Sequence, residues 1–313
     1  MDIVLYYLGI LWYNPGNPPA YPGTRRKELI ALETRKAFMD CVNDHLATID
    51  PAKLLFNRNE FWLIQSGYEQ LECYAVDHRL HNMAIALPLA RSLHDGAYRK
   101  FGVHKGGSIL RVPYYTHCLM VCRMLVNIRP ALSHDDEDVV LSAALCHDLI
   151  EDIPFPEGGT ELYTQYGLDK RIYEVVKLLS KRSDFSLEDE RRYFESIREN
   201  PLALLVKLAD RGNNVEDLYN MSPKKFAEYL EETEHYFFPI SDYGIARYPE
   251  LAMAIHILKD KITILTTVSR VMTARLEERN RQLRDERNRL KLENQQLREE
   301  WMRIWEEEMR DGT

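Results

Sequence analysis

The sequence lacks an apolar run long enough to cross a membrane, which takes about 20 residues. Its most apolar N-terminal stretch, Met1–Tyr13, is too short, contains Asp2 and has no basic residues ahead of the apolar part. We therefore expect neither a membrane-spanning helix nor a signal peptide. We interpret this stretch as a buried strand or short helix, followed by a loop rich in proline and glycine from Asn14 to Gly23.

Cysteine is scarce as well. The chain has five cysteines, an odd number, and no two of them form a CxxC pair. This usage predicts reduced thiols in a cytoplasmic protein rather than a disulfide framework. Cys118 and Cys122 stand four residues apart next to His117, which is compatible with a zinc site, but free cysteines on an apolar helix face are more often plain core.

The chain has no excess of positive charge. Its net charge is −8, whereas proteins whose main partner is nucleic acid are usually basic, so nucleic acid is not expected as the main partner. Hydrophobic residues make up 45% of the sequence, an ordinary share for a globular protein with a real core. The length of 313 residues is enough for two domains, or for one large domain with appendages.

Runs that alternate with a period of two are few, so strands are expected to be scarce and the fold mostly α. Apolar residues instead recur at helical spacing along most of the chain. The helices predicted on this basis are Arg25–Leu46, Glu60–Tyr74, Ala84–Phe101, Leu119–Ile128, Asp138–Glu151, Arg171–Ser180, Leu187–Arg198, Leu202–Ala209, Pro223–Phe238 and Tyr248–Val268.

The C-terminal residues repeat every seven positions, which predicts a coiled coil. The d positions are Leu276, Leu283, Leu290, Leu297 and Ile304, and the a positions are Thr273, Asn280, Arg287, Asn294 and Trp301. Asparagine at a with leucine at d favours a parallel dimer. In that dimer the flanking pairs Glu286–Lys291 and Glu293–Arg298 attract, and the pair Arg279–Arg284 repels.

Other arrangements of this segment remain open. Residues 270–291 carry eight basic and four acidic side chains, whereas residues 292–313 carry three and seven, so an antiparallel pair would lay positive on negative charge. A single helix that folds back on the globular part is a third possibility. A basic-zipper DNA reader is disfavoured, because Glu277, Glu278 and Asp285 interrupt the arginines and would face phosphates badly.

The main chemical signal is His147-Asp148 followed by Glu151-Asp152, directly after an apolar stretch. On a continuous helix, His147 and Glu151 would lie one turn apart on one face, as would Asp148 and Asp152. Several unpaired acids are costly to bury, and a divalent cation is a natural partner for them.

Two more candidate ligands stand next to apolar helices. His117 precedes one, and Asp210 ends another. Two imidazoles and two carboxylates suit manganese, iron or zinc, with positions left for water and phosphate oxygens. Such an ion generates hydroxide near neutral pH, and Glu151 and Asp152 stand where they could orient the water or pass its proton on. Each signal is weak alone, whereas the ordered set is far more specific.

From about Ala84 to Ile240 these motifs resemble the HD hydrolase domain of the bifunctional alarmone synthetase/hydrolases and of the small stand-alone alarmone hydrolases. The resemblance covers roughly half of the chain. The similar segments are His94–Gly102, Pro113–His117, Cys146–Asp152, Ser180-Lys181, Lys207–Asn214, and Glu232-Thr233 with Tyr236 and Pro239.

The resemblance implies an HD-domain helical bundle that holds one divalent metal ion, with manganese expected. It implies that the metal ligands are His117, His147, Asp148 and Asp210. It implies that Glu151 and Asp152 handle the attacking water. It also implies that the nucleotide substrate is contacted by Arg99, Lys100, Lys181, Asn214 and Tyr236.

The implied reaction is hydrolysis of the 3′-pyrophosphate of (p)ppGpp, which gives GDP or GTP and pyrophosphate. We predict four parts of the chain: an N-terminal segment of unknown role, largely helical, at 1–83; the HD-type phosphohydrolase domain at 84–245; a helical connection at 246–267; and the coiled coil at 268–313. A homodimer through the coil is expected.

The sequence also departs from the family. Extra residues, Val103–Val112, separate Gly102 from Pro113; Ile153 stands where the family often has threonine; and Gly212-Asn213 replaces a bulkier Leu-His pair. These differences leave two alternatives open. One is an HD phosphohydrolase for another nucleotide, such as a 3′-phosphorylated dinucleotide or a deoxynucleotide. The other is a catalytically idle HD module for nucleotide sensing or scaffolding, against which the four intact metal positions argue.

Overall fold

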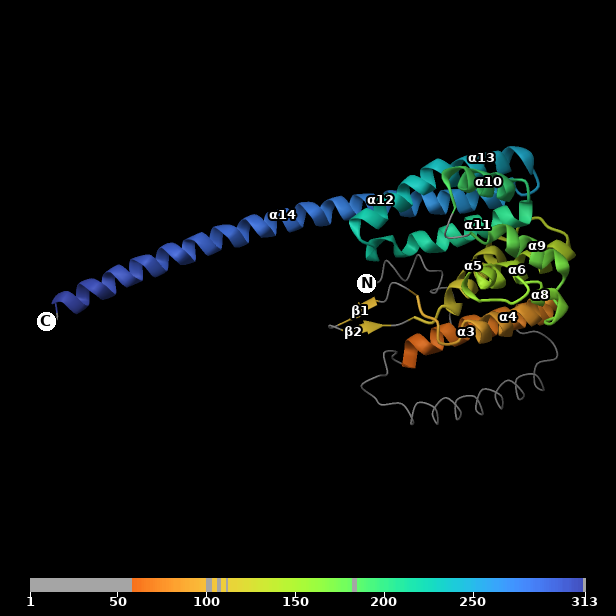
Figure 1. Cartoon of the computed structure of the whole chain (residues 1–313), viewed down its shortest axis with the longest axis horizontal. Coiled ribbons are helices and arrows are strands. Elements are labelled where there is room, and N and C mark those ends of the chain that lie inside the picture. The colour runs from red at the N-terminus through yellow and green to blue at the C-terminus, as the bar shows by residue number, and fades with distance from the viewer. Residues whose placement is uncertain (1–57, 100–102, 106–107, 111, 182–184, 312–313) are drawn as a thin grey trace, which may run out of the picture. The chain divides into compact units, whose positions relative to one another are not determined.

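The computed structural model describes residues 58–99, 103–105, 108–110, 112–181 and 185–311. The predicted helix Arg25–Leu46 and the interpretations of Met1–Tyr13 and Asn14–Gly23 lie outside these residues. The elements, shown in Figure 1, are α3 (Arg58–Asp77), α4 (His81–Leu93), β1 (Val103–Lys105), β2 (Ser108–Leu110), α5 (Tyr115–Ile128), α6 (His134–Cys146), α7 (Leu149–Asp152), α8 (Glu161–Thr164), α9 (Lys170–Leu179), α10 (Leu187–Arg198), α11 (Pro201–Asn214), the 3-10 helix η2 (Val215–Asn220), α12 (Pro223–Glu232), the π-helix η3 (Thr233–Phe237), α13 (Phe238–Arg247) and α14 (Ala252–Asp311). The mostly α prediction is confirmed.

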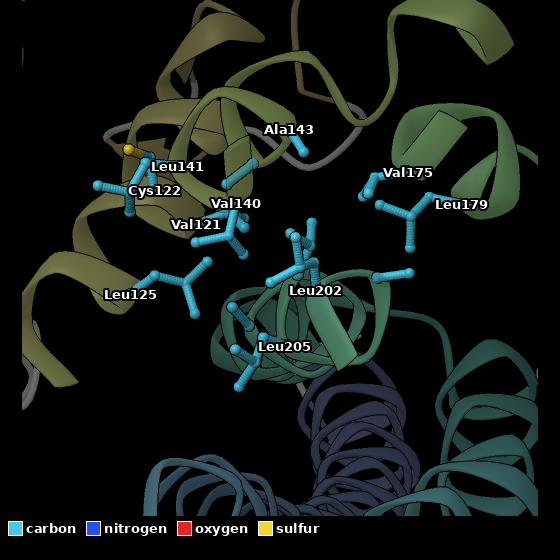
Figure 2. Packing of buried hydrophobic residues seen from close by; sticks show 14 of the residues in the cluster. Val121, Cys122, Leu125, Val140, Leu141, Ala143, Val175, Leu179, Leu202 and Leu205 are labelled. Carbon is cyan, nitrogen blue, oxygen red and sulfur yellow. The ribbon is translucent and has the colours of Figure 1, made fainter. Parts of the chain in front are cut away.

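Helix α11 lies at the centre of the bundle. Asn200 caps its first turn by accepting from the backbone N–H groups of Leu202 and Ala203, and Pro201 fits the first helical position. The residues that follow are apolar on nearly every side of the helix, which is the pattern of a helix buried all round. Figure 2 shows Leu202 and Leu205 of α11 facing side chains of α5, α6 and α9. The end of α11 that carries polar residues is thereby fixed within the bundle.

The predicted helix Asp138–Glu151 is wrong at one point, because the chain breaks it at His147 and Asp148. α6 ends at Cys146, and α7 begins at Leu149. Successive side chains on an unbroken helix diverge by about 100°. The turn between α6 and α7 instead allows the adjacent His147 and Asp148 side chains to approach the same point.

The predicted helix Ala84–Phe101 is also wrong at its C-terminal end, because α4 stops at Leu93. Gly96 follows with a φ of 77°, a left-handed conformation that glycine adopts without a steric penalty. The chain then becomes extended: Tyr98 pairs antiparallel with Pro113, and the backbone N–H of Arg99 donates to the Val112 carbonyl at 2.8 Å. The extra residues 103–112 therefore contain a hairpin, with Val103 opposite Leu110.

Helix α14 runs unbroken from Ala252 to Asp311 (Figure 1). Its first turns pack on α11, α13 and η2 through buried residues such as Ile255, Leu258 and Ile262. From Leu276 to Trp305 its side chains are exposed. The long C-terminal helix is thus confirmed, while its assembly into a coiled coil stays a prediction. Among the described residues, no helix is both long and apolar enough to span a bilayer.

Candidate metal centre

Four elements converge on one point of the bundle. His117 lies in the first turn of α5, and His147 directly follows α6. Asp148 directly precedes α7, and Asp210 lies near the end of α11. Both histidines and Asp210 are buried. The structure therefore brings together all four residues that the sequence proposes as metal ligands.

The ligand atoms of these residues lie close to one another. The Nε2 atoms of His117 and His147 are 3.2 Å apart. Asp210 Oδ1 is 3.1 Å from the first and 3.7 Å from the second of these nitrogens. Asp148 Oδ2 is 3.0 Å from the Nε2 atom of His147 and 3.6 Å from that of His117. Two imidazole nitrogens and two carboxylate oxygens thus surround a common centre.

The hydrogen bonds of the two rings fix where their protons lie. Nδ1 of His147 is 2.9 Å from the Ala144 carbonyl oxygen, which can only accept, so this nitrogen carries the hydrogen. Nδ1 of His117 is 2.7 Å from Asn213 Oδ1, and the amide nitrogen of Asn213 donates to Glu216 Oε2 at 3.1 Å. Because that bond orients the amide, its oxygen faces His117, whose Nδ1 is also the donor.

This arrangement leaves the Nε2 atoms of both rings pointing at each other. Two imidazole nitrogens that face each other between two carboxylates need a positive charge among them, either a proton or a metal ion. An imidazole whose Nδ1–H is held by an acceptor is the usual form of a histidine metal ligand. The group formed by His117, His147 and Asp210 could hold a divalent ion, and Asp148 adds a fourth donor.

The electrostatics of the cluster agree with a cation site. Burial lowers the pKa of His147, but Asp148 and then Asp210 outweigh it and raise this pKa to about 10. Burial raises the pKa of both carboxyl groups, yet neighbouring positive charges lower them below their usual range. For Asp148 the main such charge is His147, and for Asp210 it is Lys207, whose Nζ is 3.3 Å from Asp210 Oδ2. Both carboxylates are therefore ionised at neutral pH.

Cys118 also lies near His147 and Asp148. Its side chain is fully buried, and burial raises the pKa of its thiol well above the usual range. Cys122 is likewise buried, in the core. Since metals bind the thiolate rather than the thiol, the four nitrogen and oxygen donors fit an ion better than a set that includes Cys118.

Glu151 and Asp152 lie on α7, one turn beyond the cluster. Glu151 is exposed, and its Oε2 accepts the backbone N–H of Lys181 at 3.1 Å. Desolvation, opposed by that hydrogen bond and helped by Asp148, raises the pKa of Glu151. Asp152 Oδ2 is 3.8 Å from Nε2 of His94, a buried nitrogen that has no hydrogen-bond partner among the described residues. The raised pKa of Glu151 makes its carboxylate suited to accept a proton at neutral pH.

The proposed substrate residues are distributed around the cluster. Asn214 donates to Asp210 Oδ1 at 2.5 Å and accepts from Arg99 Nη2 at 3.3 Å. This amide links the guanidinium to a carboxylate of the centre. Lys100 lies outside the described residues.

Lys181 and Tyr236 lie together on another side. The ammonium of Lys181 pairs with Glu190 and is 3.5 Å from Glu232 Oε1. Tyr236, in η3, stacks on Phe194 with ring centres 4.4 Å apart. The ammonium of Lys181 is therefore engaged by carboxylates, while its backbone contacts Glu151. Substrate binding by either residue stays a prediction.

Glu232 and Thr233, in the last of the segments that resemble the family, hold Arg211. The buried guanidinium pairs with Glu232, is 3.4 Å from Thr233 Oγ1, and lies between the rings of Tyr229 and Phe237 at 4.0 and 3.9 Å. These contacts fasten the polar end of α11 to the π-helix η3. π-Helical turns are rare and often occur at functional sites.

Sequence reasoning missed two residues that orient the cluster. Tyr114 donates its hydroxyl to Asp148 Oδ2 at 2.7 Å, and Asn213 holds His117. Asn213 stands next to Asn214, and Tyr114 lies three residues before His117, which was the available signal. The neighbouring Gly212 also has a structural reason, because a Cβ there would lie 3.2 Å from Met124 Sδ, which is tighter than ordinary van der Waals contact.

The described residues form a helical bundle with two histidines and two aspartates clustered at one point, a group that could hold a metal ion. Residues 114–214 match the family model described as HD domain. The described cluster lies within the matched residues.

Curated relatives narrow the resemblance. The chain is 29% identical over 161 residues to guanosine-3′,5′-bis(diphosphate) 3′-pyrophosphohydrolase of Haemophilus influenzae, a match that covers 49% of this chain and 21% of that protein. It is 27% identical over 188 residues to the bifunctional (p)ppGpp synthase/hydrolase SpoT of Escherichia coli, covering 58% and 24%. It is 30% identical over 142 residues to the probable GTP diphosphokinase RSH2, chloroplastic, of Arabidopsis thaliana, covering 42% and 19%.

The resemblance to the HD domain of alarmone synthetase/hydrolases is thus confirmed. The chain spans about a fifth to a quarter of the length of these relatives.

Proposed function

We propose that the protein hydrolyses the 3′-pyrophosphate of (p)ppGpp. In this reaction water is consumed, the bond between the nucleoside 3′ oxygen and the pyrophosphate breaks, and GDP or GTP leaves with pyrophosphate. The observation that carries the proposal is the convergence of His117, His147, Asp148 and Asp210, with Glu151 and Asp152 one turn beyond. Two of the relatives bear names that include this hydrolysis.

The cluster is proposed to hold one divalent ion, with manganese as the expected metal, because two imidazoles and two carboxylates suit it. Bound there, the ion supplies positive charge that polarises phosphate oxygens and acidifies water. Asn213 and the Ala144 carbonyl keep the two imidazoles turned inward. Tyr114 restrains Asp148, because burial and the adjacent Asp148 carboxylate raise the pKa of its hydroxyl and keep it a donor.

Glu151 is the proposed acceptor of the water proton. The pKa of Glu151 is shifted toward neutral pH, which makes its carboxylate a better proton acceptor. The backbone N–H of Lys181 holds this carboxylate in place. Asp152 is proposed to assist from the same turn. Arg99, held by Asn214 beside the centre, is proposed to meet the negative charge of the substrate, which a guanidinium binds well.

Two further proposals concern the setting of the enzyme. The exposed heptad leucines of α14 support a homodimer through this helix. The four described cysteines are free thiols, which supports a reducing, cytoplasmic location.

The test is pyrophosphate release from ppGpp by the wild type, with and without manganese, beside Asp210→Asn and Glu151→Gln. We expect metal-dependent release by the wild type, and loss of both metal and activity in Asp210→Asn. Glu151→Gln should keep the metal and release pyrophosphate at least ~100-fold more slowly, as for loss of a proton-transfer group.

Glu174→Gln, which removes an exposed carboxylate of α9, is the matched control and should behave as the wild type. Full activity in Glu151→Gln would refute its role as proton acceptor. No release from ppGpp by a sample that binds manganese would refute the substrate assignment. Turnover of a 3′-phosphorylated dinucleotide or a deoxynucleotide would then identify the alternative hydrolase, and no turnover of either would leave the sensing module.

A further inference from the structure

One face of α14 changes its surroundings halfway along the helix. Ile255 and Ile262 precede Leu276 by three and two heptads, so they occupy the same d positions as the exposed leucines. Both isoleucines are fully buried against the HD domain, whereas Leu276 is 58% exposed. Thr266, at an a position, is also buried. The apolar stripe that packs on the domain therefore continues as the heptad stripe beyond it.

This continuity restricts how a second helix can lie on the stripe. Helices pack with their axes 8–10 Å apart, and that space beside residues 252–269 is filled by the domain's own α11, α13 and η2. In a parallel dimer, residues 252–269 of the partner would extend along the same line into that filled space. Since α14 has no break in which the two helices could diverge, the parallel pair is blocked where the domain begins.

An antiparallel partner limits this conflict to its last few residues, since residues beyond about 308 of the partner would reach the filled stretch. Its HD domain would lie at the opposite end of the paired helices, and only its C-terminal end would approach the first domain. The stripe drifts by about 20° per heptad on a straight helix, which a left-handed supercoil compensates in either orientation. The position of the domain therefore selects the orientation of the coil.

Charge favours the same orientation. Residues 270–291 carry eight basic and four acidic side chains, and residues 292–313 carry three and seven. An antiparallel pair lays the positive half of each helix on the negative half of the other. The individual flanking pairs of the antiparallel arrangement neither favour nor oppose it, because attractive and repulsive pairs are equal in number. With Leu276 opposite Trp301, Arg279–Glu300 and Glu277–Arg298 attract, while Glu286–Glu293 and Arg284–Lys291 repel.

We infer that a second copy of this chain pairs with the exposed heptad stripe of α14 in the antiparallel direction, with the two HD domains at opposite ends. The inference rests on the proposed self-association and adds its orientation. It replaces the parallel pairing that asparagine at the a positions favours, because steric exclusion by a folded domain outweighs a preference of the core residues.

The experiment measures distances between spin labels in the full-length dimer. Arg275→Cys, Arg289→Cys and Arg303→Cys lie at the same heptad position, c, and are exposed. Each is labelled singly after Cys41→Ser and Cys73→Ser, since the other three cysteines are buried. An antiparallel pair centred near Arg289 gives a short distance there. In the dimers labelled at 275 or at 303, each label would lie on the order of 40 Å from the same label on the partner, from the rise of 1.5 Å per residue.

Equal short distances at all three positions would overturn the antiparallel orientation and keep the dimer. A monomeric mass with no coupling between labels would overturn the self-association itself. Circular dichroism checks that each variant keeps its helices. Pyrophosphate release is measured on the same samples, so failure of the hydrolase proposal is scored separately from either outcome.

Discussion

At the scale of single residues, the cluster depends on the atoms behind the imidazoles. The Nδ1 atoms of His117 and His147 are both held by acceptors, so both Nε2 atoms turn inward. One acceptor belongs to the backbone and cannot be mutated away. The other belongs to Asn213, whose role can be tested directly.

We expect Asn213→Ala to weaken manganese binding by about 10- to 100-fold, the usual cost of losing the group that orients a metal-bound histidine. The ring of His117 would then be free to rotate. Metal content after titration measures the effect. Asn213→Asp, which keeps an acceptor for His117, should retain more affinity. Equal affinity in the wild type and Asn213→Ala would contradict the orienting role.

The charge state of the cluster predicts a pH dependence of metal binding. Burial lowers the pKa of His147, but Asp148 and Asp210 raise it to about 10, so the metal-free protein keeps a proton on this ring at neutral pH. An incoming ion must displace that proton. Affinity should therefore rise with pH below about 10, by up to about tenfold per unit.

Calorimetry in buffers of different ionisation enthalpy counts the protons released when manganese binds. About one proton per ion is expected between pH 7 and 8. Affinity that does not change with pH, together with no proton release, would show that His147 is already neutral in the metal-free protein.

At the scale of elements, periodicity predicted most helices well. Leu187–Arg198 has the predicted bounds, and α9 differs by one residue at each end. The turn at His147-Asp148 was not predictable, since the residues around it keep helical spacing. Convergence of neighbouring side chains, a tertiary requirement, overrides local preference there. The ligands were predictable as a set because motifs mark them, whereas Tyr114 acts through a contact across 34 residues.

The hairpin β1–β2 was noticed in the sequence only as extra length. It lies between Arg99 and Tyr114 in the sequence, and the bridge between Tyr98 and Pro113 joins the chain at its base. Replacement of residues 103–110 by a short glycine linker should raise KM for the nucleotide and leave manganese affinity unchanged, because the bridge below it remains. Steady-state kinetics and metal titration measure the two effects. Loss of the metal would show that the hairpin supports the cluster itself.

At the scale of the whole molecule, α14 has two roles that a truncation can separate. Thr273 is still half-buried, and Arg270 pairs with Glu234 of η3, so the domain needs the helix up to about this point. A chain that ends after Arg275 should be monomeric and turn over at the wild-type rate per site. Sedimentation and pyrophosphate release check both statements. A folded but inactive monomer would mean that a second copy completes the active site.

Because α14 continues without a break beyond the domain, it also places the metal centres of the two copies far apart compared with the range of electrostatic interactions. Each helical residue adds about 1.5 Å, so the roughly forty residues beyond the domain extend about 60 Å. At physiological ionic strength a charge is screened over about 8 Å. In an antiparallel pair, the charge of a substrate or metal at one centre would therefore not change the binding free energy at the other centre. Such a dimer would follow a simple hyperbolic saturation curve, and the rod would serve as an insulator rather than a signal path.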